Sequence, residues 1–407
     1  MEKQKKLINK IIITLIILFI SRIGIFIPIP GINQGEFNES IAQNTIISFL
    51  NIFSGGGFST IGIFSLGIIP YINSSIITQL LTKIIPSLEE IQKNEGESGK
   101  QKITKITRYL TTLWAIIQSI SIALWIKPYT FSWNTIFFTD LVITLTTGSI
   151  IIMWFSEIIT EYGIGNGASL LIFQNIVSNI PQNLQNYTTH INNKFIEIIL
   201  LTLSCIAILV INIVIQDSKR KINIIASKHL GENNRLNTQN YIPLKLNQGG
   251  VMPIIFASAA VTLPQYIIAN QRILNNIFNT ILSNSLFYLL SYAFLIVIFS
   301  YFYSSIILNT KDMAENLQKM GASIPNVRPG EDTIKYLNKI INKLTFIGAL
   351  FLFIIAQFPL IASKITNINL LQGLGTTSLL ILVGVSIETA KQIQTYIISE
   401  QYDNIMG

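Results

Sequence analysis

Residues 40–82, SIAQNTIISFLNIFSGGGFSTIGIFSLGIIPYINSSIITQLLT, decide the fold because they form a run of 43 residues without a charged side chain. A membrane-spanning helix needs only about 20 apolar residues, so the run is too long for one span. Three consecutive glycines at 55–57 interrupt it, and each costs a helix about 1 kcal/mol relative to alanine. We therefore expect a short segment at about 54–66 that enters the membrane and bends back before a helix starting near Leu66. A glycine-rich outer loop is the alternative interpretation.

The rest of the chain continues this pattern. Of its 407 residues, 50% are hydrophobic and 12% are charged, and this charged share is about half that of a soluble domain. Long charge-free runs recur along the chain, which indicates a polytopic membrane protein and excludes a soluble globular domain. Ten spanning helices are predicted, at about 8–29, 66–86, 108–127, 136–158, 164–181, 195–217, 250–268, 285–308, 344–362 and 370–397.

The positive charges give these helices a direction. With both chain ends on one side of the membrane, 22 of the 28 Lys and Arg residues fall on that side and 4 on the other. Because loops on the side of synthesis are enriched in Lys and Arg, both termini are expected to be cytoplasmic, or stromal in an organelle. Two basic loops on that side, 216–248 and 309–343, exceed the length that a connection needs. They are candidate docking surfaces, or orientation signals alone.

No catalytic constellation is found in the sequence. His190 and His229 fall on opposite sides of the predicted membrane, so they cannot share a metal. The glycines between 163 and 167 lack the spacing of a dinucleotide-binding motif, and they are typical of a tight turn that leads into a helix. We therefore expect no enzyme, no cofactor and no metal site.

Ionisable residues inside the predicted spans are also scarce. Ion-coupled transporters keep such groups near the midplane. Only Arg22 and Glu388 are candidates for that position here, and a place near a helix end is the alternative for each. Glu157 and Glu161 have helical spacing, but they lie at a predicted membrane edge. This deficit argues against a driven pump. A secondary transporter of a small solute, and an insertase or scaffold without a pore, remain as alternatives.

Six motifs in order along the chain resemble those of the SecY family, the central subunit of the protein-conducting translocon. They are NIFSGG at 51–56 continuing through FSLGIIPYI at 64–72, EGESGK at 95–100, GIGNGAS at 163–169, PLKLN at 243–247 leading into PIIFAS at 253–258, the stretch from NL at 316–317 through GA at 321–322 to VRPGE at 327–331, and GTTSLLI at 375–381.

The resemblance implies an all-α membrane fold of ten transmembrane helices in two pseudo-symmetric five-helix halves, here 1–181 and 195–407. Its substrate would be an unfolded polypeptide, which crosses the centre or leaves sideways into the lipid bilayer. The segment 54–67 would be a re-entrant plug that closes the pore. The plug residues singled out are Ser54, Gly55, Gly56, Gly57, Gly62 and Gly67.

The family also implies a pore constriction and a lateral gate. A ring of branched aliphatic side chains excludes water and ions by dewetting. The matching ring positions are Ile72, Ile76, Ile172, Ile176, Ile255 and Ile381. The gate would separate the helix at 66–86 from those at 250–268 and 285–308. Polar groups on or near that seam would be Ser74, Ser75, Thr78, Gln79 and Asn247, although bonds within one helix are the alternative for each Ser or Thr.

In the basic loops, Lys219, Arg220, Lys221 and Arg328 match positions at which the family docks ribosomes or the SecA ATPase motor. The resemblance further implies a SecE-like subunit and possibly a SecG-like one. The chain is short for the family and rich in Ile, Asn, Lys and Thr, as expected from an AT-rich genome. We expect a plastid protein of the thylakoid membrane, with a bacterial inner membrane as the alternative.

Overall fold

The computed structural model describes residues 2–37, 56–57, 61–94, 96–188, 194–226, 241–250, 252–254, 256–257, 260, 285–366 and 376–406. By internal packing the chain divides into two compact units. The first comprises Met1–Asn192 and Gly373–Gly407, and the second comprises Asn193–Gln372.

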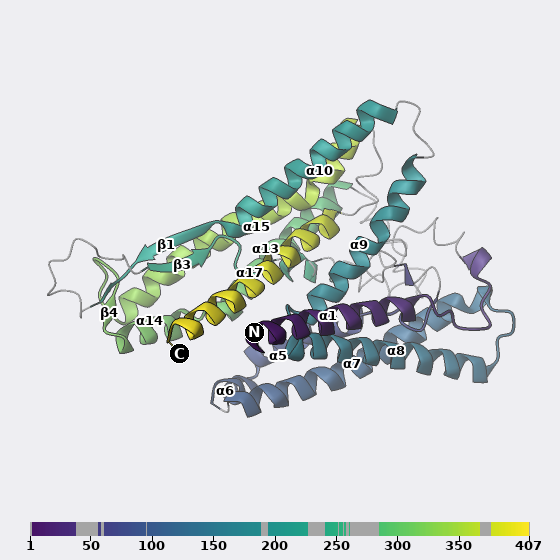
Figure 1. The fold of residues 1–407 in the computed structure, drawn as a ribbon, viewed down its shortest axis with the longest axis horizontal. Helices are drawn as coiled ribbons and strands as arrows, with labels where there is room; N and C mark the ends of the chain where they lie inside the picture. The colour runs from purple at the N-terminus through teal and green to yellow at the C-terminus, as the bar shows by residue number, and fades with distance from the viewer. Residues whose placement is uncertain are drawn as a thin grey trace. The chain divides into compact units, whose positions relative to one another are not determined.

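The first unit is helical in its described part. Its elements are α1 (Glu2–Ile25), α5 (Ile69–Ile84), α6 (Pro86–Asn94), α7 (Gly96–Ile126), the short 3-10 helix η1 (Lys127–Tyr129), α8 (Thr135–Tyr162), α9 (Gly167–Thr188) and α17 (Thr376–Met406). Helix α7 packs between α5 and α8, while α8 also contacts α1 and α9 (Figure 1). The last helix, α17, belongs to this unit because it packs against α9.

A tight turn, residues 163–166, connects α8 to α9. It also contacts the first helix of the chain, α1, and the last, α17. The Ile164 N–H donates to Thr14 Oγ1 of α1 at 3.1 Å. The Gly165 N–H donates to Gln392 Oε1 of α17 at 2.8 Å. The glycine run is therefore the predicted turn leading into a helix, and its backbone holds α1 and α17 to the α8–α9 pair.

In its described residues the second unit combines helices with four short strands. Its elements are α10 (Lys194–Asp217), β1 (Lys219–Asn223), β2 (Ile225–Ala226), β3 (Tyr241–Lys245), α13 (Ser285–Ile307), α14 (Thr310–Lys319), β4 (Ala322–Ser323) and α15 (Glu331–Thr366). Strand β1 pairs antiparallel with β3, and β2 pairs antiparallel with β4. Figure 1 shows β1, β3, β4 and α14 grouped together. The described parts of the two basic loops predicted at 216–248 and 309–343 therefore fold into one structured region.

That region has its own apolar core. Its members come from β1, β3, α14, the segment after β4 and the first turns of α15: Ile222, Leu244, Leu317, Ile324, Leu337, Ile340, Ile341 and Leu344. We call these strands, α14 and the start of α15 the basic module. Sequence analysis predicted loops here because charges recur every few residues, and it did not predict the strands.

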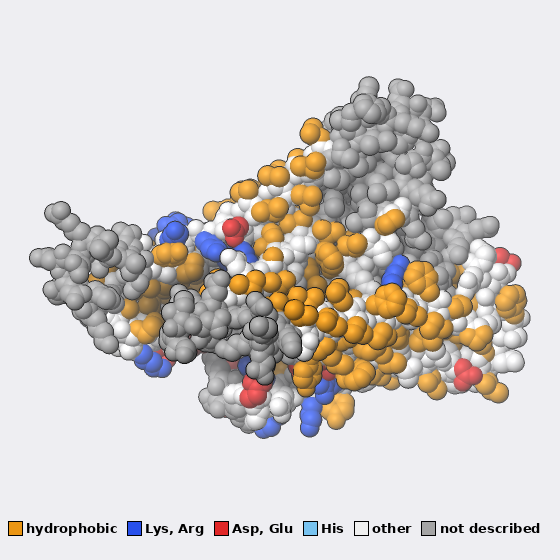
Figure 2. All heavy atoms as spheres, in the orientation of Figure 1, with side chains coloured by type: hydrophobic (Ala, Val, Ile, Leu, Met, Phe, Trp, Pro, Cys, Tyr) orange, Lys and Arg blue, Asp and Glu red, His pale blue; other side chains and the backbone are white. Residues whose placement is uncertain are grey.

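The described helices carry the composition of membrane spans. Five of them are long and apolar enough to cross a membrane, within Leu7–Ile25, Gly96–Tyr129, Thr135–Tyr162, Leu289–Lys319 and Glu331–Gln357. Large apolar side chains on these helices point outward, among them Phe19, Trp154 and Phe294. On the face drawn in Figure 2, hydrophobic side chains cover much of the described surface, and Lys and Arg occur in small groups. Such a surface is suited to lipid and not to water.

Candidate functional site

Of the expected plug at 54–67, the structure describes Gly56, Gly57 and residues 61–67, and residues 61–68 form a run of turns with one bridge residue, Gly62. It runs beside the residues that follow α1. The Ile63 N–H donates to Ile27 O, and the Ile29 N–H donates to Ile61 O, each at 3.1 Å. Pro28 and Gly62 form an isolated antiparallel bridge. Non-helical backbone survives in a membrane protein where protein groups satisfy it, and these bonds meet that condition.

Close contact requires glycine at two positions around this segment. A Cβ atom on Gly62 would lie 2.1 Å from Ile25 O, and one on Gly148 of α8 would lie 2.0 Å from Ile63 O. Both contacts are with backbone, which cannot swing aside as a flexible side chain can. These glycines therefore allow the segment to rest directly on the end of α1 and on α8. The sequence named Gly62 as a plug residue, but it gave no sign of either backbone contact and drew no attention to Gly148.

The segment is also deeply buried. Ile61, Leu66 and Ile68 are at most 2% exposed, and the Phe64 ring meets the Phe155 ring edge-on at 6.3 Å. Ile61 has a φ of 41°, a costly conformation for a β-branched residue. We call residues 61–68 with their contacts on α1 and α8 the plug seat. Ser54 and Gly55 lie outside the described residues.

Five of the six expected pore-ring residues are described, and all five belong to the first unit. Ile72 and Ile76, one turn apart on α5, are partly exposed. Ile172 and Ile176 on α9 are 2% and 3% exposed, and Ile381 on α17 is fully buried. Because α9 and α17 pack together, Ile172, Ile176 and Ile381 lie on one pair of packed helices. Ile255 lies outside the described residues, and the convergence of the six on one ring stays a prediction.

The polar residues of α5 fall into two groups. Ser74 and Thr78 are buried, and their hydroxyls donate to backbone carbonyls of α5 at 2.8 Å. Thr78 Oγ1 also accepts a hydrogen bond from Thr107 of α7 at 3.2 Å. Ser75 and Gln79 are partly exposed, and the Gln79 amide donates to Ser75 Oγ at 3.3 Å. The intrahelical alternative therefore describes Ser74 and Thr78, and a gate role for α5 stays a prediction.

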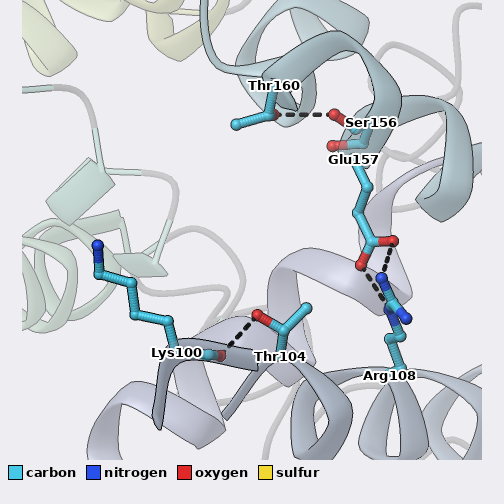
Figure 3. Close-up of polar contacts among 6 residues, drawn as sticks. All are labelled: Lys100, Thr104, Arg108, Ser156, Glu157 and Thr160. Carbon is cyan, nitrogen blue, oxygen red and sulfur yellow. Dashed lines mark hydrogen bonds and ion pairs between the residues drawn. The ribbon is translucent and has the colours of Figure 1, made fainter. Parts of the chain in front are cut away.

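An ion pair that the sequence did not reveal joins α7 to α8 (Figure 3). Arg108 Nε donates to Glu157 Oε1 at 2.9 Å, and Nη2 donates to Oε2 at 2.8 Å. The Glu157 side chain is 12% exposed. The other contacts in Figure 3 are local, since the Thr104 and Thr160 hydroxyls each donate to a backbone carbonyl four residues earlier. A two-bond guanidinium–carboxylate pair fixes the register of the α7–α8 hairpin.

The expected docking residues lie on the basic module. Lys219, Arg220 and Lys221 are exposed on β1, and Lys221 Nζ lies 4.7 Å from the centre of the Tyr241 ring on β3. Arg328 is exposed in the turn before α15. Three adjacent cations on a paired strand, with few acidic neighbours on that strand, can attract a polyanion or an acidic protein surface.

The Arg328 turn is rigid. Its backbone carbonyl accepts a hydrogen bond from Thr333 Oγ1 at 2.8 Å. Gly330 has a φ of 101°, in the region that favours glycine. The Ile334 N–H then donates to Gly330 O at 3.2 Å and starts α15. The guanidinium is thus presented from a fixed backbone.

Comparison with known proteins agrees with this architecture. A sequence profile of the SecY family matches residues 62–390. The protein translocase subunit SecY of Pyropia yezoensis is 56% identical over 409 residues, covering 100% of both chains. The same subunit of Synechocystis is 45% identical, covering 100% of this chain and 96% of the relative.

Solved structures share the fold at low identity. One described as the structure of a protein conducting channel superposes with a TM-score of 0.69 at 19% identity, covering 97% of this chain and 93% of that chain. Sec61 in the canine ribosome–channel complex gives a TM-score of 0.66 at 18% identity, with the same coverage. The profile, the full-length relatives and the shared fold together show that this chain belongs to the SecY family.

Proposed function

We propose that this chain is the central, pore-forming subunit of a protein translocase. It would act as a passive gated channel that moves unfolded polypeptides across the membrane and releases apolar helices sideways into lipid. Its full-length relatives are protein translocase subunits, which supports the subunit role. The alternative of a secondary transporter finds no support in those relatives.

The plug seat is the observation that carries the gating part of this proposal. A plug that can leave the pore must have its backbone hydrogen-bonding groups paired in the closed state. It must also be separate from the helices that form the channel wall. Residues 61–68 meet the first requirement through the Ile27, Ile29 and Ile61 backbone bonds. Gly62 lies against Ile25 O, and Ile63 O lies against Gly148, with no room for a side chain at either glycine, so the closed position would be specific.

Gly148→Val tests this proposal. The added side chain would overlap Ile63 O and lift residues 61–68 from α8, so we expect a several-fold rise in ion conductance in reconstituted bilayers. Gly35→Ala is the matched control, since the nearest atom to its Cβ would be 3.6 Å away. A correctly assembled Gly148→Val protein with unchanged conductance would contradict the assignment of the plug.

The remaining parts of the channel follow from the family resemblance. The isoleucines at 72, 76, 172, 176, 255 and 381 would form the constriction, and the helices at 66–86, 250–268 and 285–308 would form the lateral gate, with Asn247 near it. Asn247 is buried, and its side-chain amide donates to Gly250 O at 2.7 Å, which holds the start of the segment expected to form one wall of the gate. The halves 1–181 and 195–407 would open against each other.

The driving force would come from partners, because we expect no catalytic site in this chain. The exposed cations of the basic module support docking of a ribosome or of a SecA ATPase motor, while SecE-like and possibly SecG-like subunits would complete the channel. Structural neighbours include Sec61 bound in a ribosome–channel complex.

Algal and cyanobacterial relatives support a plastid origin and the thylakoid membrane as its location. Detection of the chain in stroma-free thylakoid fractions would agree with this location. Its absence there would contradict it.

A further inference from the structure

A small polar cavity lies within the second unit, where the residues that follow β3 meet α13 and α15. Its walls include Gln248, Ser300, Ser304 and Thr345. All three hydroxyl residues are at most 6% exposed. Its described lining residues share no member with the plug seat, the expected pore ring or the docking residues, and they include Asn247, which is expected near the gate.

A chain of hydrogen bonds runs along one side of the cavity. Thr345 Oγ1 of α15 donates to Ser304 Oγ of α13 at 2.9 Å. Ser304 Oγ in turn donates to Gln248 Oε1 at 2.6 Å. Thr345 Oγ1 also donates to Ile341 O at 2.8 Å, so its one proton is shared between that carbonyl and Ser304 Oγ. The Ser304 proton goes to Gln248 Oε1, which leaves the Gln248 nitrogen available for another partner.

Two polar atoms facing the cavity have no hydrogen-bond partner among the described residues: Gln248 Nε2 and Ser300 Oγ. Ser300 precedes Ser304 by one helical turn, so both hydroxyls lie on the same face of α13. A buried polar atom without a partner costs about 1–3 kcal/mol. Two such atoms on one cavity therefore indicate a ligand that forms hydrogen bonds with both.

The size of the cavity limits what that ligand can be. The cavity has room for about one water molecule. Close approach of the chain to α15 sets this limit, since a Cβ on Gly348 would lie 2.7 Å from Leu246 O. Among the described residues that line the cavity, none is charged, so a bare ion is disfavoured.

We propose that this cavity binds one structural water molecule. The water would accept a hydrogen bond from Gln248 Nε2 and exchange one with Ser300 Oγ. It would thereby bridge the segment after β3 to α13, while the direct Gln248–Ser304–Thr345 chain ties the same segment to α15. The water molecule and the Gln248–Ser304–Thr345 hydrogen bonds together fix the path of the backbone from Asn247 into the residues that begin at Met252.

A high-resolution density map of the full chain in its membrane complex tests the site directly. We expect an ordered water peak within hydrogen-bond distance of Gln248 Nε2 and Ser300 Oγ. A map that resolves buried waters elsewhere in the second unit but has no peak here would overturn the proposal.

Thermal unfolding of Ser300→Ala supplies a second measurement with opposite outcomes. If a water is bound, the variant removes one of its partners, and the unfolding midpoint falls by about 2 °C. If the cavity is dry, the variant removes an unpaired buried hydroxyl, and the midpoint stays the same or rises. Ser305→Ala is the control, because Ser305 is exposed on the same helix and bonds only to the Phe302 carbonyl. A midpoint of Ser300→Ala at or above that of the wild type would overturn the proposal.

Discussion

At the scale of single residues, one ion pair adds a specific contact between α7 and α8. Arg108 and Glu157 are 49 positions apart in the chain and share two hydrogen bonds. Arg108 is about half-exposed whereas Glu157 is largely buried. Solvent therefore partly screens the charge of the guanidinium. The pair contributes less to the free energy of unfolding than a buried pair does.

Arg108→Ala should lower the free energy of unfolding by about 0.5–1 kcal/mol. A double-mutant cycle with Glu157→Gln should give a coupling of similar size. The pair Lys100–Glu97 is a control, because its atoms are 3.6 Å apart and its side chains are 69% and 79% exposed. Equal coupling in the two pairs would contradict the role assigned to the Arg108 bonds.

The sequence could not predict this pair. Glu157 was noticed only for its helical spacing with Glu161, since a partner on another helix depends on the register between α7 and α8. The close contact at Gly148 is hidden for the same reason. Glycine composition predicts a weak helix or a turn, but not the Ile63 carbonyl that approaches it.

At the scale of elements, α15 shows how a membrane helix can continue into the basic module. It begins at Glu331, whereas sequence analysis predicted a span starting near 344. Lys335, Lys339 and Lys343 lie four residues apart and are all exposed. The charges that seemed to interrupt the span thus form one solvated stripe of an amphipathic helix, and the opposite face enters the module's core.

Ile340→Asp tests this packing. Ile340 is 7% exposed in that core, so a carboxylate there should cost about 3 kcal/mol or more and open the module to limited proteolysis. Lys339→Asp changes the neighbouring exposed residue and should leave the protease pattern unchanged. Equal protease resistance of the two variants would contradict the core assignment.

Most helices were predictable from hydropathy, because long apolar runs bounded by charges have few other interpretations. The nine predicted spans that fall mainly on described residues each correspond to an observed helix. The strands β1 to β4 were not predicted, since each is only two to five residues long. Their pairing joins segments about 20 to 100 positions apart.

At the scale of the whole molecule, the resemblance to SecY is confirmed over the full chain. The basic balance of the composition now has a structural location. Lys219, Arg220, Lys221 and Arg328 lie on one folded module whose common core includes Ile222 and Ile324. This arrangement favours a docking surface over charges that serve orientation alone.

Arg328→Glu should strongly impair transport that depends on a motor or a ribosome, because it reverses the charge on a rigid, exposed turn. Assembly should be unaffected, since the Thr333 bond to that turn uses the backbone carbonyl and not the guanidinium. Normal transport by the assembled variant in a reconstituted assay would contradict the docking role.

The central claim is that an unfolded polypeptide passes the isoleucines of this chain. Site-specific photo-crosslinking to a stalled translocating chain tests it most directly. The probe is placed at Ile72 or Ile76, which are partly exposed on α5. The control position is Leu15, on the outward face of α1. We predict adducts with the stalled chain from positions 72 and 76 and none from position 15. Adducts from position 15 alone, or from none of the three while transport proceeds, would contradict the account.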